Sequence, residues 1–303
     1  MNSLNYFKAL SDSTRIRIYN VLQKHELSVN ELVTLMDMGQ SRISRHLKIL
    51  TDSGLLKCRR NGVWAFYTSH KGSDIAVFSE AVQSLFSKEA PLRDDCRRAE
   101  LMIEERSAKT RHFFNSIAHK WDVLKKDILG SFDINAAILD SIGETDHAVD
   151  LGCGTGELLT YLTRHAGQVI GVDSSAMMLA EARKRFSQGN IPVDLRLGEL
   201  EHLPLKDREV DLAIISLALH HLSEPEIAIK EAHRILKDQG ILIIAEFERH
   251  DNEMLRQEYG DRWLGFSSGE MKQWITDRLF SLCQVKSHNL NQSLVLNIYT
   301  CNK

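Results

Sequence analysis

A glycine-rich turn near the middle of the chain has the residue types of a small-molecule cradle. Residues 148–157 read AVDLGCGTGE, so Gly152, Gly154 and Gly156 stand at alternate positions. Glycine tolerates φ > 0 and lets a ligand lie against bare main chain, and the N–H groups that open a following helix attract a carboxylate or phosphate. Apolar residues before the turn and a helical pattern after it predict a strand, a turn and a helix.

The spacing of these glycines distinguishes two kinds of nucleotide-binding turn. Dinucleotide-binding turns follow G-x-G-x-x-G, whereas the third glycine here, Gly156, comes one residue early. The segment resembles the motif of class I methyltransferases, which bind S-adenosyl-L-methionine (SAM). The resemblance implies SAM as cofactor, S-adenosylhomocysteine as product or effector, and a doubly wound, Rossmann-like sheet with an antiparallel last strand. It disfavours a dinucleotide-dependent oxidoreductase.

Acidic residues follow at the ends of the next two predicted strands. Residues 169–173 end in Asp173, which lies 21 residues beyond Gly152, and residues 193–200 contain Glu199. A ribose diol needs a carboxylate acceptor at that distance, so we expect Asp173 to bind the ribose hydroxyls. The resemblance implies that Glu199 accepts from the adenine amino group and that the next N–H donates to a ring nitrogen. With Asp150 at the SAM ammonium, the whole expected cofactor-binding set is Asp150, Gly152, Cys153, Gly154, Gly156, Asp173, Ser174, Glu199, Leu200 and Ser216.

Three histidines are candidate catalytic bases, because they follow the fourth and fifth predicted strands, where doubly wound sheets place ligands. They are His220, His221 and His250. Methyl transfer from a sulfonium needs no enzyme nucleophile, so Cys153 is not expected to attack, but an acceptor that must lose a proton needs a base. In the structural alternative, His221 pins its loop and His250 is polar surface. No metal is expected, since adjacent residues on a helix diverge by about 100°.

The segment after the fourth predicted strand also bears on the substrate. Residues 216–221 read SLALHH and lack the Asn/Asp-Pro-Pro-Tyr/Phe signature of enzymes that methylate amino groups of DNA and protein. Methylation of DNA bases is therefore disfavoured, and a small-molecule methyl acceptor is expected.

The elements that must position these residues belong to a chain long enough for two domains. It has 303 residues, of which 43% are hydrophobic and 26% charged, so it can bury a core. No apolar run approaches the roughly 18 residues of a membrane span, and the first residues lack a signal-peptide pattern, so we expect a cytoplasmic location without membrane association. Five scattered cysteines form no CxxC pair, and neither disulfides nor a zinc site is expected.

The N-terminal end differs in charge and pattern from the rest. Residues 1–72 hold 11 Lys and Arg against 5 Asp and Glu, although the whole chain has a net charge of −3. A basic module is the electrostatic footprint expected of a protein that touches nucleic acid. Apolar periodicity and an Asn-Gly turn predict a helix-turn-helix followed by a β-hairpin wing. The predicted elements are helices at 14–24, 28–36 and 40–53, and strands at 55–60 and 63–68.

Three short segments of this module resemble the ArsR/SmtB family of winged-helix regulators. They read FKALSDSTR at 7–15, QSRISRHLKIL at 40–50 and SGLL at 53–56. The resemblance implies a homodimer, formed by the flanking helices, that binds a palindromic double-stranded DNA operator. Amide, hydroxyl and guanidinium groups on the second helix suit a major groove, and His46 faces either DNA or the packing. The expected DNA-binding residues are Gln40, Ser41, Arg42, Ser44, Arg45 and His46, with Arg59 and Arg60 on the wing.

The module departs from the metal-sensing patterns of that family. Residues 26–35 contain no cysteine and residues 74–88 no histidine. We therefore expect no metal at the family's usual sites and look for the inducer in the C-terminal domain.

The predicted organisation is a multidomain α+β and α/β chain. A winged-helix domain covers residues 1–88, a linker helix and lid cover 89–130, and a class I methyltransferase domain covers 131–303. The charged start of the linker is expected to be a solvated helix. In the lid, Phe114, Ile117 and Trp121 share a helical face, which suits either closure over a pocket or core packing.

Two functions remain open at this point. In the first, the chain is a DNA-binding transcriptional regulator whose C-terminal domain senses SAM or S-adenosylhomocysteine, or methylates a small molecule. In the second, it is primarily a small-molecule methyltransferase with an accessory DNA-binding domain. The sequence keeps the cofactor positions and plausible bases, so it does not decide whether the chain is an enzyme. An arsenic methyltransferase would need converging thiolates, and the cysteines form no such motif.

Overall fold

The computed structural model divides the chain into two compact units, residues 1–106 and 107–303. It describes residues 2–70, 72–187, 192–278 and 280–303. The boundary falls inside one long helix, α6 (Ala90–Ile117), and the finer limits at 88 and 130 remain predictions. No helix in the described parts of the chain is both long and apolar enough to span a bilayer.

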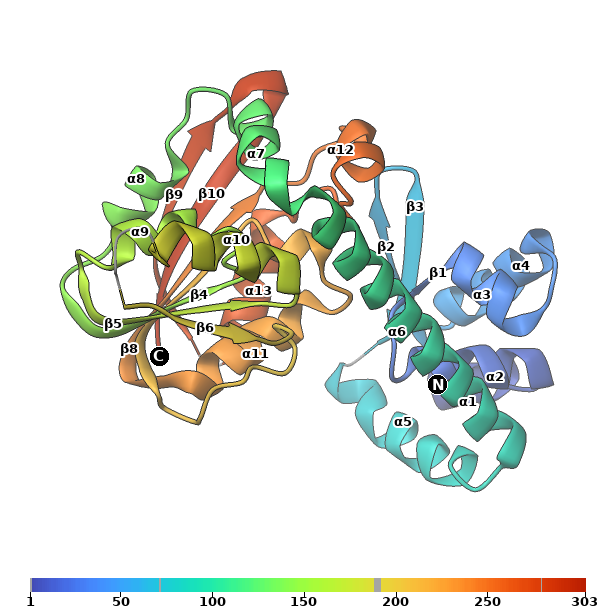
Figure 1. The fold of residues 1–303 in the computed structure, drawn as a ribbon. Helices are drawn as coiled ribbons and strands as arrows, with labels where there is room; N and C mark the ends of the chain where they lie inside the picture. Colours follow the sequence, from blue (N-terminus) through green and yellow to red (C-terminus); the bar gives the residue numbers. More distant parts are fainter. Residues whose placement is uncertain (1, 71, 188–191, 279) are drawn as a thin grey trace. The chain divides into compact units, whose positions relative to one another are not determined.

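The first unit is a winged helix-turn-helix (Figure 1). A capping box begins α3, where Ser28 and Glu31 cap each other's backbone N–H. Its three strands form an antiparallel sheet of order β1-β3-β2. The elements are α1 (Asn2–Ala9), α2 (Ser13–Leu22), β1 (Leu27–Ser28), α3 (Val29–Met36), α4 (Gln40–Asp52), β2 (Leu56–Asn61), β3 (Trp64–Ser69) and α5 (Ser73–Phe86).

The turn of the wing lies one residue later than predicted. Asn61 pairs with Trp64, so the two-residue loop is Gly62-Val63 rather than Asn61-Gly62. Gly62 supplies the positive φ of 57° that such a loop requires. The Asn61 side chain is buried, and the position therefore belongs to the sheet.

The first half of α6 is part of the core of this unit, not the solvated connector that its charges suggested. Leu92, Cys96 and Ala99 are buried among the apolar side chains of the winged helix. Asp95 is also buried and accepts from Arg17 at 2.7 Å. The sequence does not predict this burial because the partner of Asp95, Arg17, lies 78 positions away in the chain.

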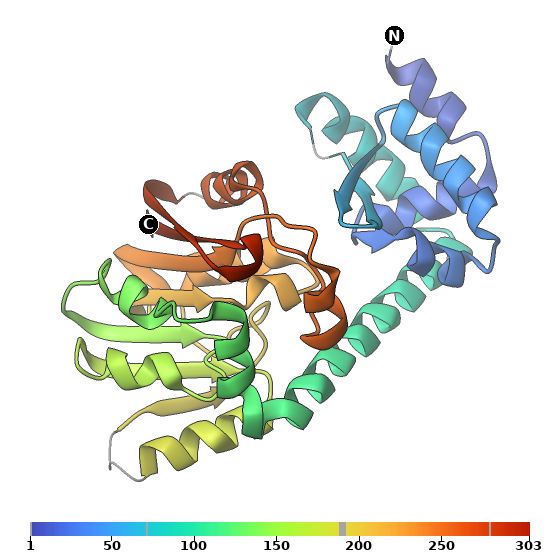
Figure 2. The same cartoon turned by 90° about the horizontal axis from the view of Figure 1, so that it is seen from above.

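The second unit is a seven-stranded mixed sheet of order β6-β5-β4-β7-β8-β10-β9, with helices on both faces (Figures 1 and 2). Strands β4 to β8 are parallel, and β10, the last strand in the sequence, is antiparallel to β8 as predicted; β9 pairs antiparallel with β10. The strands are β4 (Thr145–Leu151), β5 (Ala166–Asp173), β6 (Asp194–Leu197), β7 (Val210–Ser216), β8 (Leu236–Phe247), β9 (Ser281–Asn289) and β10 (Val295–Asn302). The helices are α7 (Trp121–Leu129), α8 (Ile134–Leu139), α9 (Glu157–Leu162), α10 (Ala176–Ser187), α11 (Pro225–Ile235), α12 (Glu253–Glu258) and α13 (Ser268–Asp277), with short 3₁₀ turns η1 (Ala118–Lys120), η2 (Leu219–His221) and η3 (Asn291–Ser293).

The centre of this sheet is buried on both faces. Side chains such as Ile214, Ile243 and Ile298 are almost fully buried, as is typical of strands that helices cover on both sides. The carboxyl ends of β4, β5 and β7 meet at one edge, because these strands are parallel neighbours. The turns that follow them are therefore held together on a rigid frame.

Candidate functional site

The turn between β4 and α9 depends on its three glycines. Gly152, Gly154 and Gly156 have φ of 83°, 53° and 77°, which side chains rarely tolerate. A Cβ on Gly152 would lie 2.8 Å from the Cβ of Ala218, and one on Gly156 would lie 2.9 Å from the ring of Phe186. Gly152 and Ala218 both line the cavity described below, whereas Gly156 and Phe186 lie where α9 packs against α10.

Asp173, at the end of β5, fixes this turn. Its Oδ2 accepts from the N–H of Gly154 at 2.8 Å and its Oδ1 accepts from the N–H of Ser175 at 2.7 Å. Burial raises the pKa of Asp173, and the two N–H donors oppose that shift. The carboxylate thus joins the glycine turn to the next turn, and its remaining lone pairs are available to a ligand.

Asp150 lies deeper, at the end of β4, and is almost fully buried. Burial raises its pKa to about 7; nearby Lys125 opposes the rise and Asp173 adds to it. A cation placed beside Asp150 would favour its charged form. The residue therefore suits an ammonium ligand.

A cavity lies over these turns. It gathers all of the expected cofactor residues except Gly156, which in the described structure caps α9 and packs against Phe186 instead. The lining residues from the expected set are Asp150, Gly152, Cys153, Gly154, Asp173, Ser174, Glu199, Leu200 and Ser216. The sequence thus predicted one connected site from four separate segments.

The second half of α6 and the start of α7 close the cavity. Phe114 and Trp121 both line it, with ring centroids 5.4 Å apart, whereas Ile117 packs on Met178 in a small apolar cluster. The sequence analysis missed polar lining residues from the same region, Arg111 and Lys125 among them. Arg111 forms an ion pair with Glu199, and Lys125 pairs with Glu157 at 2.8 Å.

Of the three candidate bases, His221 alone lines the large cavity among the described residues. Its Nδ1 lies 3.3 Å from the carbonyl oxygen of Gly260, and its ring meets Phe114 edge-on at 4.7 Å. Since a carbonyl only accepts, Nδ1 carries the proton and Nε2 is the basic atom. Burial and then the neighbouring His220 hold the pKa of His221 well below its usual value, so the ring is neutral.

His220 and His250 lie elsewhere. The Nδ1 of His220 lies 2.7 Å from Glu246 and its Nε2 lies 3.6 Å from Asp261. Burial opposes the charged ring, but these two carboxylates outweigh it and raise the pKa of His220 to about 9. His250 accepts from the N–H of Asn252 at 3.2 Å, and burial together with His220 lowers its pKa to about 4. Neither ring faces the large cavity in the described structure.

The two adjacent histidines converge, although their separation along the chain suggested divergence. Their ring centroids are 4.1 Å apart on the 3₁₀ turn η2, and with Asp261 they bring three possible metal ligands within 4.8 Å of one another. The described contacts, however, use the same atoms for protons: His221 donates Nδ1–H to Gly260, and His220 sits between two carboxylates. The protonated His220 thus supplies the positive charge between Glu246 and Asp261 that a metal cation would otherwise supply.

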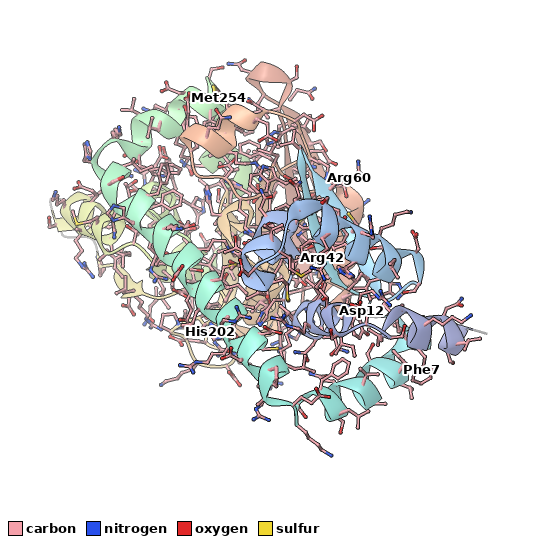
Figure 3. The ribbon with its side chains drawn as sticks, turned by 90° about the vertical axis from the view of Figure 1, so that its right-hand side faces the viewer. Phe7, Asp12, Arg42, Arg60, His202 and Met254 are labelled. Carbon is pink, nitrogen blue, oxygen red and sulfur yellow. The ribbon has the colours of Figure 1, made fainter. Side chains whose placement is uncertain are left out.

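The helix-turn-helix presents a polar face on α4 (Figure 3 labels Arg42 on this helix and Arg60 on the wing). The side chains that the sequence assigned to the groove are exposed, while apolar side chains of the same helix, such as Leu47, are buried. The exposed set is Gln40, Ser41, Arg42, Ser44 and Arg45 on α4 and Arg60 on β2.

Two residues expected at DNA are placed differently. His46 is 8% exposed, and its Nδ1 lies 3.8 Å from Asp12, so it packs rather than faces outward. Its spacing from Ile43 and Leu50 already matched the buried stripe of the helix. Arg59 donates to both carboxylate oxygens of Glu26, at 3.2 and 2.6 Å, which holds it against the wing.

Comparison with known families gives two matches. Residues 12–57 match the bacterial regulatory protein, arsR family, and residues 149–244 match a methyltransferase domain. Both matches agree with the resemblances in the sequence and with their order along the chain. The methyltransferase match contains the glycine turn and strands β5 to β7.

Curated relatives are similar over parts of their length. An uncharacterized 37.1 kDa protein in transposon TN4556 of Streptomyces fradiae is 40% identical over 33% of this chain and 30% of that protein. The ubiquinone/menaquinone biosynthesis C-methyltransferase UbiE of Rubrivivax gelatinosus is 32% identical over 47% of this chain and 57% of that enzyme. The demethylmenaquinone methyltransferase of Lactiplantibacillus plantarum is 36% identical over 36% of this chain and 48% of that enzyme. The chain thus spans less than two thirds of the length of each.

Solved structures share the fold of the second unit. A Burkholderia thailandensis 1,6-didemethyltoxoflavin-N1-methyltransferase, with bound 1,6-didemethyltoxoflavin and S-adenosylhomocysteine, aligns with a TM-score of 0.56 at 18% identity and covers 66% of this chain and 90% of its own. The [4+2]-cyclase SpnF aligns with a TM-score of 0.51 at 18% identity over 58% of this chain and 86% of its own. The fold therefore serves more than one chemistry, and the residues of the site must carry the functional argument.

Proposed function

Because this chain joins an ArsR-family helix-turn-helix domain to a SAM-dependent methyltransferase domain, we propose that it is a transcriptional regulator whose operator binding responds to SAM or S-adenosylhomocysteine. The observation that carries the proposal is the single cavity that gathers the glycine turn with Asp150, Asp173 and Glu199. A ligand-responsive domain joined to a DNA reader is the arrangement that such regulation needs.

Each group in the cavity has a part of the ligand that it suits. The N–H groups at the start of α9 suit a carboxylate, because those of Gly152, Gly154 and Gly156 already donate within the protein. The buried Asp150 suits the ammonium beside it. Asp173 suits the ribose diol. Glu199 and the N–H of Leu200 suit the amino group and a ring nitrogen of adenine. The missing Cβ atoms at Gly152 and Gly154 keep the main chain bare along this path.

The DNA-reading part of the proposal rests on α4 and the wing. Exposed Arg and Gln side chains on a helix of this kind can bind guanine and adenine edges in a major groove. Arg42 and Arg45 are the side chains best suited to bases, and Arg60 suits a phosphate.

We assign the dimer to the flanking helices. Apolar side chains of α1 and α5 are exposed in a single chain. They are Leu4 and Phe7 on α1 and Val77 and Leu85 on α5, with Phe7 64% and Val77 77% exposed. A second copy of this chain would cover them. The change Phe7→Glu should convert a dimer of the full chain into a monomer in light scattering, whereas an unchanged mass would remove α1 from the interface.

A second candidate function is methylation of a small molecule, which the placement of His221 favours. The neutral ring offers a basic Nε2 at the cavity. A smaller cavity adjoins it, and Leu129, Phe247 and Tyr259 line it together with Lys125, His220 and Asp261. One curated relative is named a demethylmenaquinone methyltransferase, and we infer a small-molecule acceptor for this side of the site.

When bound, the sulfonium supplies an activated methyl group. Transfer would need the acceptor atom in line with the carbon–sulfur bond: the acceptor's electron pair would form the new bond to the methyl carbon, and the pair of the broken carbon–sulfur bond would stay on the sulfur of S-adenosylhomocysteine. His221 Nε2 takes the acceptor's proton, and the Gly260 carbonyl keeps the other ring nitrogen protonated. Phe114 and Trp121 exclude water from this side of the site.

One titration separates the two functions. The full chain is mixed with an operator selected from randomised duplex DNA, and the operator affinity is measured with and without SAM and S-adenosylhomocysteine. In parallel, radiolabelled methyl transfer to a metabolite mixture is measured. A nucleotide-dependent change in operator affinity without product supports the sensor; product without any change in operator affinity supports the enzyme.

The change Asp173→Ala tests the site itself. It removes the acceptor for the ribose and the brace of the glycine turn, so nucleotide affinity in calorimetry should fall by about 100-fold, the loss expected for two hydrogen bonds to a charged group. Operator affinity without nucleotide should stay close to that of the wild type. Equal loss of both would show that the site or the domain border is misplaced.

A further inference from the structure

One ion pair at the rim of the adenosyl cavity involves the helix that both units share. Arg111 of α6 pairs with Glu199, which follows β6, and both residues line the cavity. Their side chains are 36% and 45% exposed, so water screens the pair. Glu199 is also the residue that we assign to the adenine amino group.

The other half of α6 is anchored in the winged helix. Asp95 is buried between Arg17 and Arg98, and Arg106 bonds to Glu31 of α3 at 2.6 Å. The Nη1 of Arg98 also donates to the carbonyl oxygen of Leu35, at 2.9 Å. These contacts tie α6 to α2 and α3, the helices that pack behind the recognition helix α4.

Between these two ends α6 is uninterrupted. It is a single α-helix of 28 residues, and after Pro91 its sequence holds neither proline nor glycine. A helix of this kind transmits a displacement of one end more faithfully than a flexible linker would. One continuous helix therefore joins the contacts with α2 and α3 to the Arg111–Glu199 pair.

We propose that Arg111 is the residue through which adenosyl binding acts on α6. The amino group of adenine and the guanidinium of Arg111 compete for the carboxylate of Glu199, so a bound adenosyl group removes one of the contacts that hold the end of α6. The contacts of Asn115 with Ser175 and of Ile117 with Met178 stay in place. This inference rests on the proposed function, since it names how the adenosyl site regulates the DNA reader.

The competition is physically reasonable because the ion pair is weak. An exposed pair joined at one nitrogen contributes little to stability, whereas a bound adenine would cover the carboxylate of Glu199 and donate a charge-assisted N–H bond to it. The small free energy of this ion pair also limits how far operator affinity can change. Release of one exposed ion pair can change operator affinity by about two- to fivefold.

The reciprocal effect follows from linkage. If adenosyl binding must displace Arg111, then removing the guanidinium should favour adenosyl binding by the same factor. A guanidinium that merely orients Glu199 toward adenine would have the opposite effect, because its loss would weaken adenosyl binding. The sign of the change therefore distinguishes the two roles.

The test uses Arg111→Met in the full chain, with S-adenosylhomocysteine as the probe. Its affinity, measured by calorimetry, should rise by about two- to fivefold. Operator affinity without S-adenosylhomocysteine should match that of the saturated wild type, and adding the probe should change it no further. The control Lys184→Met removes the cation of a surface pair on α10, Lys184 with Glu181 at 2.7 Å, and should behave as the wild type.

A second variant keeps the proposal falsifiable if Arg111→Met folds poorly. Glu199→Gln removes the charge that holds Arg111 but keeps an oxygen that can accept from adenine, so it should also fix the operator affinity at the saturated value. Weaker S-adenosylhomocysteine binding by Arg111→Met, or an operator response that survives in either variant, would overturn the role of Arg111. If the wild type itself shows no operator response, the sensor proposal fails instead.

Discussion

The adenosyl cavity and the recognition helix solve their binding problems in different ways. The cavity is built from main chain: three glycines with positive φ, N–H donors and an aspartate that braces them. The helix α4 uses side chains alone, which project from a regular backbone whose apolar stripe is buried. A change in the backbone of the cavity should therefore abolish ligand binding, whereas each side-chain substitution on α4 should remove only part of the DNA affinity.

Gly152→Ala is the sharpest way to break the cavity. The new Cβ would lie 2.8 Å from that of Ala218 in a backbone with φ of 83°, which costs on the order of 1–3 kcal/mol of stability. Nucleotide binding should become undetectable in calorimetry. Gly143→Ala is the matched control, because a Cβ there meets nothing within 4 Å; if Gly152→Ala binds as tightly as this control, the turn does not form the ligand path.

Charge balance beneath the cavity should show in the pH dependence of stability. The pKa of His220 in the folded chain, about 9, lies above the ordinary 6.5. Its contribution to stability is therefore complete below pH 6.5 and is lost as the pH rises through 9. The pKa of Asp150 rises to about 7, so its own contribution is lost by that pH, and the window from pH 7 to 9 reports on His220.

In that window the free energy of unfolding of the second unit should fall by about 2 kcal/mol for the wild type. His220→Asn should lack this slope, although it is less stable at neutral pH because Glu246 and Asp261 lose their shared partner. His250→Asn is the control and should keep the slope, since its pKa of about 4 lies outside the window. Urea unfolding at a series of pH values measures both, and a slope that persists in His220→Asn would assign it to another group.

On the recognition helix, Arg42→Ala should remove about 1–3 kcal/mol of operator affinity, the contribution of one bidentate contact with a base. Calorimetry with S-adenosylhomocysteine should give wild-type affinity. Arg42→Lys keeps the charge but not the planar pair of donors, so it should recover binding to DNA in general and not the preference at one base pair. Equal binding of all duplexes by the wild type would contradict this role.

The same contrast explains what the sequence could predict. The glycine turn and Asp173 were predictable because each follows from a local pattern at the end of a buried strand, and parallel pairing then brings such ends together. The exposed polar set on α4 was predictable from one helical period. In both regions the fold and most of the site are properties of short segments.

The residues that were missed or misplaced depend on partners far away in sequence. Arg111 reaches Glu199 across 88 positions and Asp95 reaches Arg17 across 78, so no local pattern marks either pair. The rings of His220 and His221 converge because distant partners hold them, Glu246 for His220 and the Gly260 carbonyl for His221. His46 is the exception, since its spacing did mark it as buried.

The wing offers the smallest test, because two neighbouring arginines should differ. Arg60 is exposed, whereas Arg59 is held by both oxygens of Glu26 and its side chain is only 15% exposed. Arg60→Ala should weaken binding to every duplex and lower the slope of log affinity against log salt by about 1, as the loss of one phosphate contact requires. Arg59→Ala should leave that slope unchanged and reduce stability by about 0–1 kcal/mol. Salt titrations of both variants by fluorescence anisotropy measure these slopes. If Arg59→Ala changes the slope and Arg60→Ala does not, the ion pair of Arg59 with Glu26 opens on DNA, and Arg59 rather than Arg60 contacts the phosphate backbone.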